Sequence, residues 1–420
     1  MDLPCSTDFS RRKLILSSAA DSVSLSGFLS SGARLESTVI KGITVTKYIK
    51  EFWTPRQRQG SSIHEISYRA CFKPQLPRFF IELFSGMDSI IYDPFSGRGT
   101  TVIEAGILGH KIVSNDASPL TLILTRPRFA PPDQADIENR ISSIAIDGSL
   151  RSDIDLSMFF HDNTLQEILS LKKYLYDRAL SGEEDDVDRW ISMVATNRLT
   201  GHSKGFFSVY TLPPNQAVSP ESQKRINKRR KQEPEYRNTK DIIIRKTKSL
   251  LRTLTVEHLD NLKNAGRSAI FLNREASDTP EIESQKIQLT VTSPPFLDVV
   301  QYSKDNWLRL WFNSLDPVKS SANITMARTV QEWSAVMASV FRELYRITKH
   351  GGWVAFEVGE VKNKTINLDE HVAPIGIDAG FECLGILINS QEFSKTSNIW
   401  GVKTMTSGTN TNRIVLFRKP

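Results

Sequence analysis

The apolar positions of the chain predict a repeating strand and helix pattern before residue 121. Short apolar runs in "SIIYD" and "HKIVSND" predict two buried strands, and "TTVIEAGILG" between them has the spacing of a helix that stops at Gly109. Another helix, opened by Pro77 and ended by Gly86, precedes the first strand. Strand, helix and strand in fewer than 30 residues form the repeating unit of a parallel, doubly wound sheet.

The alternation of predicted strands and helices resumes in the C-terminal part of the chain after a long interruption. Between residues 121 and 266 the patterns are helical or polar, so we expect a mostly helical insertion between the second and third strands. From Arg267 onward, "SAIFLNREASD" predicts a strand that ends near Asp278, and "IQLTVTSPPF" and "WVAFEVGEV" predict two more. "GFECLGILI" and "NRIVLF" predict a terminal antiparallel pair. One face of a helix before "WVAFEVGEV" should be buried, formed by Trp333, Met337, Val340, Phe341, Leu344 and Ile347.

The predicted fold class is therefore α/β with a doubly wound sheet, organised in four parts. Residues 1–45 are rich in serine and weakly periodic, which predicts an irregular lead-in. Residues 46–120 and 267–420 should form the two parts of the sheet domain, and residues 121–266 the inserted region.

Composition narrows the class of protein. With 39% hydrophobic and 24% charged residues, the chain has the balance of a soluble globular protein, and no apolar run approaches the length of a membrane span. The N-terminus lacks the apolar core of a secretion signal, so we expect a cytoplasmic protein. Cys5, Cys71 and Cys383 are too scattered for a disulfide framework, and neither they nor the histidines have ligand spacing, so we expect no metal.

The positive charge of the chain is concentrated in one segment. The formal net charge is +7, but residues 224–252 alone carry twelve Lys and Arg against three Asp and Glu, which leaves the remainder slightly negative. A run of this kind is often only a solvated helix face. Its position in the insertion favours instead a polyanion partner. The candidate residues for binding this polyanion are Lys224, Arg225, Lys228, Arg229, Arg230 and Lys231.

A glycine turn follows the first predicted strand. Glycines at this point let backbone N–H groups approach a ligand at the start of the next helix, and Asp116 ends the following strand, where a ribose diol needs an acceptor. The third glycine of a pyrophosphate clamp is missing from its expected place after Gly99, so a nucleoside without pyrophosphate suits the turn, as S-adenosylmethionine does. The alternative is a plain tight turn. Asp278 could reach an adenine amino group or could equally cap a helix.

The strand "IQLTVT" ends in a rigid corner, Ser293-Pro294-Pro295-Phe296. Neither proline can continue a sheet, because neither has an N–H for the ladder. The corner places a hydroxyl, a carbonyl and an aromatic face together, which can hold a planar amine and stack on its ring. Two fixed acceptors would aim the nitrogen lone pair at a methyl donor. The Pro-Cys dipeptide at Cys5 lies in the lead-in, which argues against methylation at carbon 5.

"DPFSGRGTTVIEA" together with "VTSPPF" resembles the amino-methyltransferases of DNA, and Thr-Ser-Pro-Pro-aromatic is the form of the cytosine-N4-specific class. Adenine-N6 relatives usually have Asp or Asn in place of Ser293. "HEISYRACFKPQLPRFF" is similar to the motif that covers the methionine part of the cofactor. The likeness spans roughly residues 60–120 and 265–420. Arg98 departs from the family pattern, where a small residue is usual, and could crowd or contact the cofactor carboxylate.

The resemblance implies a Rossmann-like methyltransferase that uses S-adenosylmethionine. It implies that a flipped cytosine is held by Ser293 and the Pro294 carbonyl, with Pro295 completing the corner and Phe296 stacked on the base. The implied cofactor residues are Asp93, Phe95, Gly97, Gly99, Thr100, Asp116, Asp278 and Phe72.

The implied activity is methylation of cytosine N4 in a specific double-stranded DNA sequence by the modification enzyme of a prokaryotic restriction-modification pair, with a cognate restriction endonuclease as a possible partner. Three alternatives stay open: an adenine-N6 DNA methyltransferase, methylation of a structured RNA, and an inactive relative that only binds nucleic acid.

Overall fold

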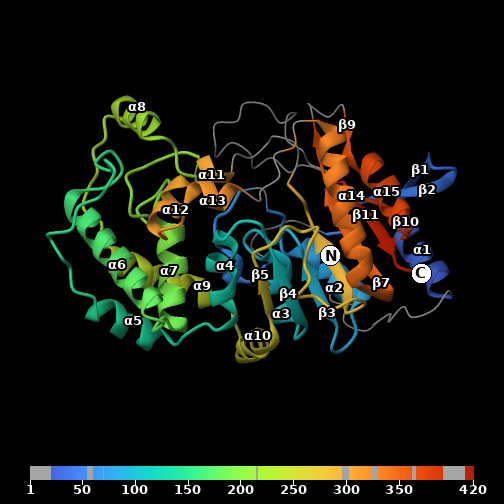
Figure 1. Cartoon of the computed structure of the whole chain (residues 1–420), viewed down its shortest axis with the longest axis horizontal. Coiled ribbons are helices and arrows are strands. Elements are labelled where there is room, and N and C mark those ends of the chain that lie inside the picture. Colours follow the sequence, from blue (N-terminus) through green and yellow to red (C-terminus); the bar gives the residue numbers. More distant parts are fainter. Residues whose placement is uncertain are drawn as a thin grey trace, which may run out of the picture.

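The computed structural model describes residues 20–53, 60–69, 71–213, 216–295, 302–322, 327, 329–361, 366–390 and 412–420. A nine-stranded sheet runs through the molecule in the order β1-β2-β10-β11-β7-β6-β3-β4-β5 (Figure 1). The strands are β1 (Arg34–Ile40), β2 (Ile43–Lys50), β3 (Ile90–Asp93), β4 (Lys111–Asn115), β5 (Ile270–Leu272), β6 (Ile287–Thr292), β7 (Thr348–Val358), β10 (Glu382–Asn389) and β11 (Asn412–Arg418).

The sheet is mixed, with a parallel centre. Strands β7, β6, β3, β4 and β5 pair in parallel, while β11 lies antiparallel between β7 and β10. The antiparallel terminal pair and the doubly wound α/β class predicted from the sequence are thus confirmed. Strand β10 also pairs in parallel with β2, which extends the sheet by the hairpin β1–β2. A separate two-stranded ribbon is formed by β8 (Glu360–Val361) and β9 (Ile366–Asn367).

Helices cover both faces of the central strands, which explains why those strands are almost continuously apolar. α2 (Gln75–Phe84) and α3 (Thr100–Ile107) pack on one face. α14 (Val330–Ile347) and α15 (Leu368–Asp378) pack on the other. The predicted apolar face of α14 is confirmed, because all six of its residues are buried against the sheet.

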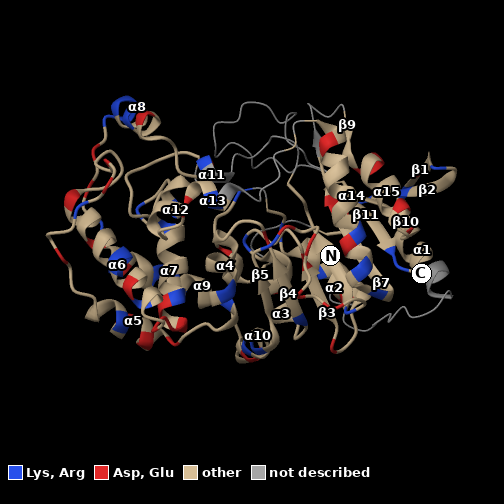
Figure 2. Ribbon diagram, viewed as in Figure 1, with Lys and Arg blue, Asp and Glu red and all other residues tan. Residues whose placement is uncertain are grey.

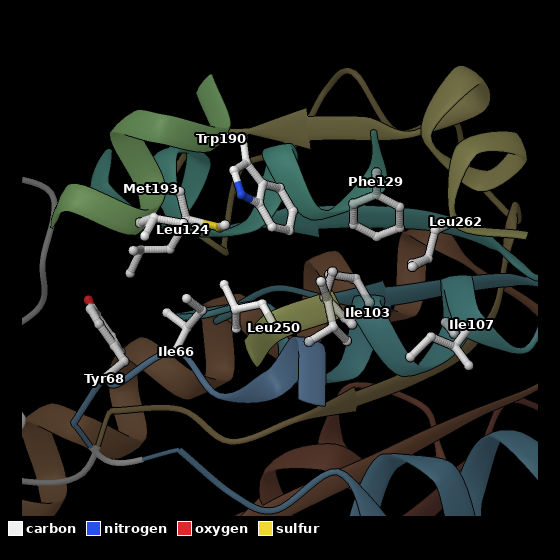
Figure 3. Packing of buried hydrophobic residues seen from close by; sticks show 14 of the residues in the cluster. Ile66, Tyr68, Ile103, Ile107, Leu124, Phe129, Trp190, Met193, Leu250 and Leu262 are labelled. Carbon is white, nitrogen blue, oxygen red and sulfur yellow. The ribbon is translucent and has the colours of Figure 1, made fainter. Parts of the chain in front are cut away.

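The long interruption between β4 and β5 is helical, as expected, and occupies the left half of Figure 1. It contains α4 (Leu120–Thr125), the 3-10 turn η4 (Arg126–Phe129), α5 (Gln134–Ser143), α6 (Asp162–Leu180), α7 (Asp186–Arg198), α8 (Pro220–Arg230), α9 (Thr239–Leu251) and α10 (Val256–Ser268). Figure 3 shows Trp190 and Met193 of α7 and Leu250 of α9 in the same apolar cluster as Ile103 and Ile107 of α3. The insertion therefore shares one core with the sheet.

Two expectations about element boundaries are wrong. From Ala20 the lead-in is ordered, with α1 (Ala20–Ser30) followed by the hairpin β1–β2, while residues 1–19 lie outside the described residues. The β-branched residues of "STVIKGITVT" favour strands, and Lys41 and Gly42 both take the positive φ of a tight hairpin turn. The strand predicted to end near Asp278 ends at Leu272, because the polar residues after it leave the sheet.

The remaining helices are η3 (Ser62–His64), α11 (Tyr302–Asp305), α12 (Trp307–Phe312) and α13 (Pro317–Ala322). Among the helices in the described part of the chain, none is long and apolar enough to cross a membrane.

Candidate cofactor and base site

The C-terminal ends of three neighbouring strands, β6, β3 and β4, bring predicted site residues to one edge of the sheet, the upper edge in Figure 1. Asp93 ends β3, Asp116 follows β4 and Ser293 follows β6. In open α/β sheets this edge is where ligands bind. Residues almost two hundred positions apart in the sequence therefore become neighbours because β3 and β6 pair in parallel.

Two buried or partly buried carboxylates hold the glycine turn in place. The Asp93 carboxylate accepts hydrogen bonds from the Phe95 backbone N–H at 3.1 Å and from the Thr292 hydroxyl at 2.6 Å. The Asp116 carboxylate accepts from the backbone N–H groups of Gly97 and Ser118, both at 2.8 Å. The turn is thus tied to β4 through Asp116 and to the end of β6 through Asp93.

Burial shifts the pKa of both acids. It raises the pKa of Asp93 to about 7, although the hydrogen bonds from Thr292 and Phe95 act in the opposite direction. Burial also raises the pKa of Asp116, against the hydrogen bonds from Ser118 and Gly97. Removing a carboxylate from water disfavours its charged form, and such shifts are typical of functional sites.

The turn needs glycine at Gly97 and Gly99, because both have positive φ, of 53° and 76°. A Cβ at Gly99 would lie 2.5 Å from Cγ2 of Thr125, a buried side chain on α4. A Cβ at Gly97 would instead point towards Tyr68, whose ring is 3.5 Å away. Gly99 is therefore required for packing, while Gly97 faces the segment that the sequence predicted to cover the cofactor.

That segment, residues 64–72, is held over the turn by Arg98. The Arg98 guanidinium donates to the backbone carbonyls of His64 at 3.2 Å, Ile66 at 2.8 Å and Phe72 at 3.4 Å. Its Nε donates to the hydroxyl of Thr100. The structure therefore brings Phe72 and Thr100 to the turn. Arg98 thus anchors the chain around the turn, and its contact with the cofactor carboxylate stays a prediction.

The Ser-Pro-Pro corner is fixed from α14. The Pro295 carbonyl accepts a hydrogen bond from the indole Nε1 of Trp333 at 3.0 Å, and Pro294 is buried. Ser293 is half-buried and lies beside Glu357 of β7, because the residues that precede them, Thr292 and Phe356, are paired in register. Phe296 lies outside the described residues, so its stacking role stays a prediction.

Asp278 does not lie with Asp93 and Asp116 at the C-terminal ends of the strands. The next residue, Thr279, donates to Glu343 near the C-terminal end of α14, and its carbonyl accepts from Arg346. This part of α14 adjoins the start of β6, since Lys286 donates to the carbonyl of Ile347. Asp278 therefore lies towards the N-terminal ends of the strands, away from the glycine turn.

Asn273 takes the place at the end of β5 instead, and its side-chain amide donates to the Asp116 carbonyl at 2.8 Å. No sequence pattern singled out this asparagine, because the strand was expected to continue beyond it.

The sequence interpretation also missed Glu357 and Asn412. Glu357 is 7% exposed and accepts a hydrogen bond from the Asn412 side chain on β11 at 2.9 Å. Burial raises the pKa of Glu357, while its bonds to Ser293 and Asn412 lower it. A signal was present, because Glu357 is an acid inside the apolar strand "WVAFEVGEV". Asn412 carried no such signal.

The basic run divides into two groups. Several of its members hold the protein together: Lys246 and Arg252 pair with Glu65, Lys240 donates to the Ile144 carbonyl, and Lys248 pairs with Glu138. The six candidate DNA-binding residues lie in or directly after α8 and are exposed. Figure 2 shows α8 as a basic element on the same side of the molecule as the C-terminal ends of the strands.

Two of the α8 cations have specific neighbours. The Arg230 guanidinium lies 3.8 Å from the centre of the Tyr210 ring, and Lys224 pairs with Asp155 at 3.6 Å, both side chains being exposed. The exposed ion pair contributes little free energy and would leave Lys224 able to bind phosphate. Among the described residues, no group of three or more His, Cys, Asp or Glu side chains could hold a metal ion.

The raised pKa of Asp93 predicts a specific pH dependence of stability. Asp93 is protonated in the folded protein between about pH 4 and 7 but ionised in the unfolded chain, so folding takes up a proton there. The unfolding free energy of the wild type, relative to Asp93→Asn, should therefore fall as pH rises through this window, by up to about 4 kcal/mol. Urea unfolding of both proteins from pH 4 to 8 measures this difference, and a constant difference would contradict the assignment. Asp116 and Glu357 are present in both proteins, so their contributions to the pH dependence cancel in the difference between the two unfolding free energies.

Comparisons with known proteins relate the chain to DNA methylases. Residues 37–122 match a family profile described as DNA methylase, N6_N4_Mtase. The chain is 23% identical over 261 residues to the type II methyltransferase M.MvaI of Kocuria varians, a match that covers 55% of this chain and 52% of that protein. It is 28% identical over 143 residues to the type II methyltransferase M.MjaII of Methanocaldococcus jannaschii, covering 32% of this chain and 26% of the other.

The chain thus spans about half the length of the first of these relatives and about a quarter of the second. Among solved structures, the rRNA methyltransferase aviRa of Streptomyces viridochromogenes aligns with 86% of this chain and 90% of its own, at 12% identity and a TM-score of 0.34. The profile match and the two type II methyltransferases support a distant relationship to the N6/N4 amino-methyltransferases of DNA.

Proposed function

We propose that the protein transfers a methyl group from S-adenosylmethionine to the exocyclic N4 amine of a cytosine flipped out of double-stranded DNA. The observation that carries the proposal is the meeting of the glycine turn and the Ser293-Pro294-Pro295 corner at one edge of the sheet. The family match of residues 37–122 supports the reaction class, and Ser293, in the place where adenine-specific relatives usually have Asp or Asn, supports cytosine.

The residues at the turn suit this cofactor. Backbone N–H groups of the turn are already ordered by Asp116, and Gly97 leaves space beside Tyr68 where a side chain would otherwise stand. Three buried or partly buried carboxyl groups, Asp93, Asp116 and Glu357, lie at this edge. A cationic ligand would favour their ionised forms, against the burial that raises the pKa of each. When bound, S-adenosylmethionine supplies an electrophilic methyl group on a cationic sulfur.

The corner suits a planar amine. The Ser293 hydroxyl and the Pro294 carbonyl would accept the two N–H groups, which draws the nitrogen lone pair out of conjugation with the ring. Trp333 fixes the corner through the Pro295 carbonyl, so the acceptors are held in place before the base arrives. Phe296 would stack on the base.

The base must leave the duplex to reach this corner, at a cost of a few kcal/mol. We propose that the exposed cations of α8 supply much of the DNA affinity by neutralising phosphates. We further propose that the protein is the modification enzyme of a restriction-modification pair with a cognate endonuclease; the support is that both curated relatives are type II methyltransferases.

Neutralising α8 should weaken DNA binding and its dependence on salt. Removal of one cation that binds a phosphate should reduce the slope of log K against log salt by about 0.9. We therefore expect the triple change of Lys228, Arg229 and Lys231 to glutamine to flatten the slope, as measured by fluorescence anisotropy at several salt concentrations.

A control is available on α10, at the opposite edge of the sheet, where Lys263 and Arg267 are also exposed. Their replacement by glutamine should leave the slope unchanged. If the α8 variant and the wild type have equal slopes, the exposed cations of α8 do not bind phosphates and form only a solvated helix face.

Transfer to DNA itself is tested with S-adenosylmethionine labelled in its methyl group. The label should enter double-stranded genomic DNA of mixed sequence and not ribosomal RNA. Label confined to RNA, or retained entirely by the cofactor with every DNA offered, would contradict the proposal.

A further inference from the structure

A buried glutamate stands beside the proposed catalytic serine. Glu357 is the penultimate residue of β7, between β6 and β11, and its neighbour Phe356 is paired in register with Thr292, the last residue before Ser293. On the other side Glu357 is paired with Ile414 of β11. This register places Glu357 beside Ser293 on the neighbouring strand.

Among the described residues, Glu357 accepts a hydrogen bond from a polar side chain and forms no ion pair with a cation. The Asn412 amide donates to Oε1 at 2.9 Å. The next residue of β11, Arg413, forms a buried ion pair with Asp369 of α15 and so is already neutralised. Asp93 lies two strands away, beyond β6. Burying a carboxylate without a neighbouring cation costs folding free energy, which suggests a functional role for Glu357.

In its ionised form Glu357 would determine which way the serine hydroxyl points. A hydroxyl has one proton to donate and an ionised carboxylate can only accept, so a hydrogen bond between these neighbours would turn the Ser293 proton towards Glu357. The lone pairs of the Ser293 oxygen are then left for another donor. A serine without such a partner could rotate and present its proton to the base instead, which would repel an amine.

We propose that Glu357 is a positioning residue for methyl transfer: it orients Ser293 as an acceptor for the target amine and receives, through Ser293, the proton that the amine loses. The inference rests on the proposed function and deepens it.

The step balances in atoms and charge. The amine nitrogen forms a bond to the methyl carbon as the carbon–sulfur bond breaks, and the bonding pair stays on sulfur. The nitrogen then gives one proton to the Ser293 oxygen, while the serine gives its own proton to a Glu357 oxygen. The glutamate ends neutral and the serine unchanged, and the proton passes to solvent after the product leaves.

Glu357→Gln tests the inference, because glutamine keeps the shape but cannot accept the proton. We expect kcat to fall at least about tenfold, at the lower limit of typical general acid–base contributions, while KM for DNA and the Kd for S-adenosylmethionine stay within about twofold. Glu343→Gln is the matched control, since Glu343 is a well-bonded acid at the opposite edge of the sheet. It should lower stability without changing kcat.

A double-mutant cycle with Ser293→Ala separates this role from a structural one. If Glu357 acts through Ser293, Glu357→Gln should not lower kcat further once the serine hydroxyl has been removed. The double variant should then have the same kcat as Ser293→Ala alone. The inference is wrong if the reductions in kcat of the two single variants multiply in the double variant, or if Glu357→Gln has the kcat of the wild type.

If Glu357→Gln does not fold, Glu357→Asp decides the question, because it keeps the charge but withdraws it from Ser293 by one methylene. A reduced kcat with unchanged affinities is then expected, and a wild-type kcat would overturn the inference. A wild type that methylates no DNA would instead contradict the proposed function, so the two failures are distinguishable.

Discussion

Gly99→Ala should abolish cofactor binding and lower the stability of the protein. The new Cβ would lie 2.5 Å from Cγ2 and 2.6 Å from Oγ1 of Thr125, which is fully buried on α4 and cannot move aside. Alanine would also be held at a φ of +76°, which costs about 1–2 kcal/mol, and the overlap adds about 1–3 kcal/mol. Relief of the clash must move the turn away from Asp116. Thermal unfolding and calorimetric titration with S-adenosylmethionine measure the two effects.

Gly109→Ala provides the control for backbone strain alone. Gly109 has a φ of +82° at the other end of α3, and its nearest neighbour, Asn261, is at an ordinary 3.6 Å. This variant should lose a little stability and keep its cofactor affinity. If Gly99→Ala behaved like Gly109→Ala in both measurements, the turn would not be the cofactor site.

Ser293→Ala should lower kcat for methyl transfer by about 10²-fold, the loss typical of removing one preorganised hydrogen-bond partner of the transition state. Ser293 lies beside Glu357 and takes no part in the hydrogen bonds by which Asp93 and Asp116 hold the turn, so cofactor affinity should remain nearly unchanged. Single-turnover kinetics on DNA, combined with calorimetric titration of the cofactor, separate the two quantities.

Ser170→Ala is a suitable control, because Ser170 is a buried serine on α6 that only satisfies local backbone groups. It should leave kcat unchanged. An unaltered rate for Ser293→Ala would remove Ser293 from the site, whatever the base that is methylated.

The sequence predicts those elements whose location follows from the hydrophobic pattern, and those site residues that directly follow a strand. The strands ending at Asp93 and near Asp116 could be placed from their apolar runs and glycine turn, and α14 from its buried face. Parallel pairing then required their C-terminal ends to share an edge, which is why Ser293 could be joined to a turn far from it in the sequence.

What could not be predicted depends on contacts between segments that are distant in the sequence. Asn412 and Glu357 meet only because β11 inserts beside β7, and no local pattern announces that register. Arg98 was interpreted from its place in a motif, yet three backbone carbonyls of residues 64–72 determine its conformation. Asp278 was misplaced because β5 is only three residues long, and a short edge strand gives a weak signal.

Identification of the methylated nucleoside tests the central claim most directly. Double-stranded DNA is incubated with the protein and methyl-labelled S-adenosylmethionine, digested to nucleosides and separated by chromatography with mass detection. The account predicts label in N4-methyldeoxycytidine, at one sequence context. Label in N6-methyldeoxyadenosine would contradict the role given to Ser293 in base choice, and the absence of any methylated nucleoside would contradict the proposed function as a whole.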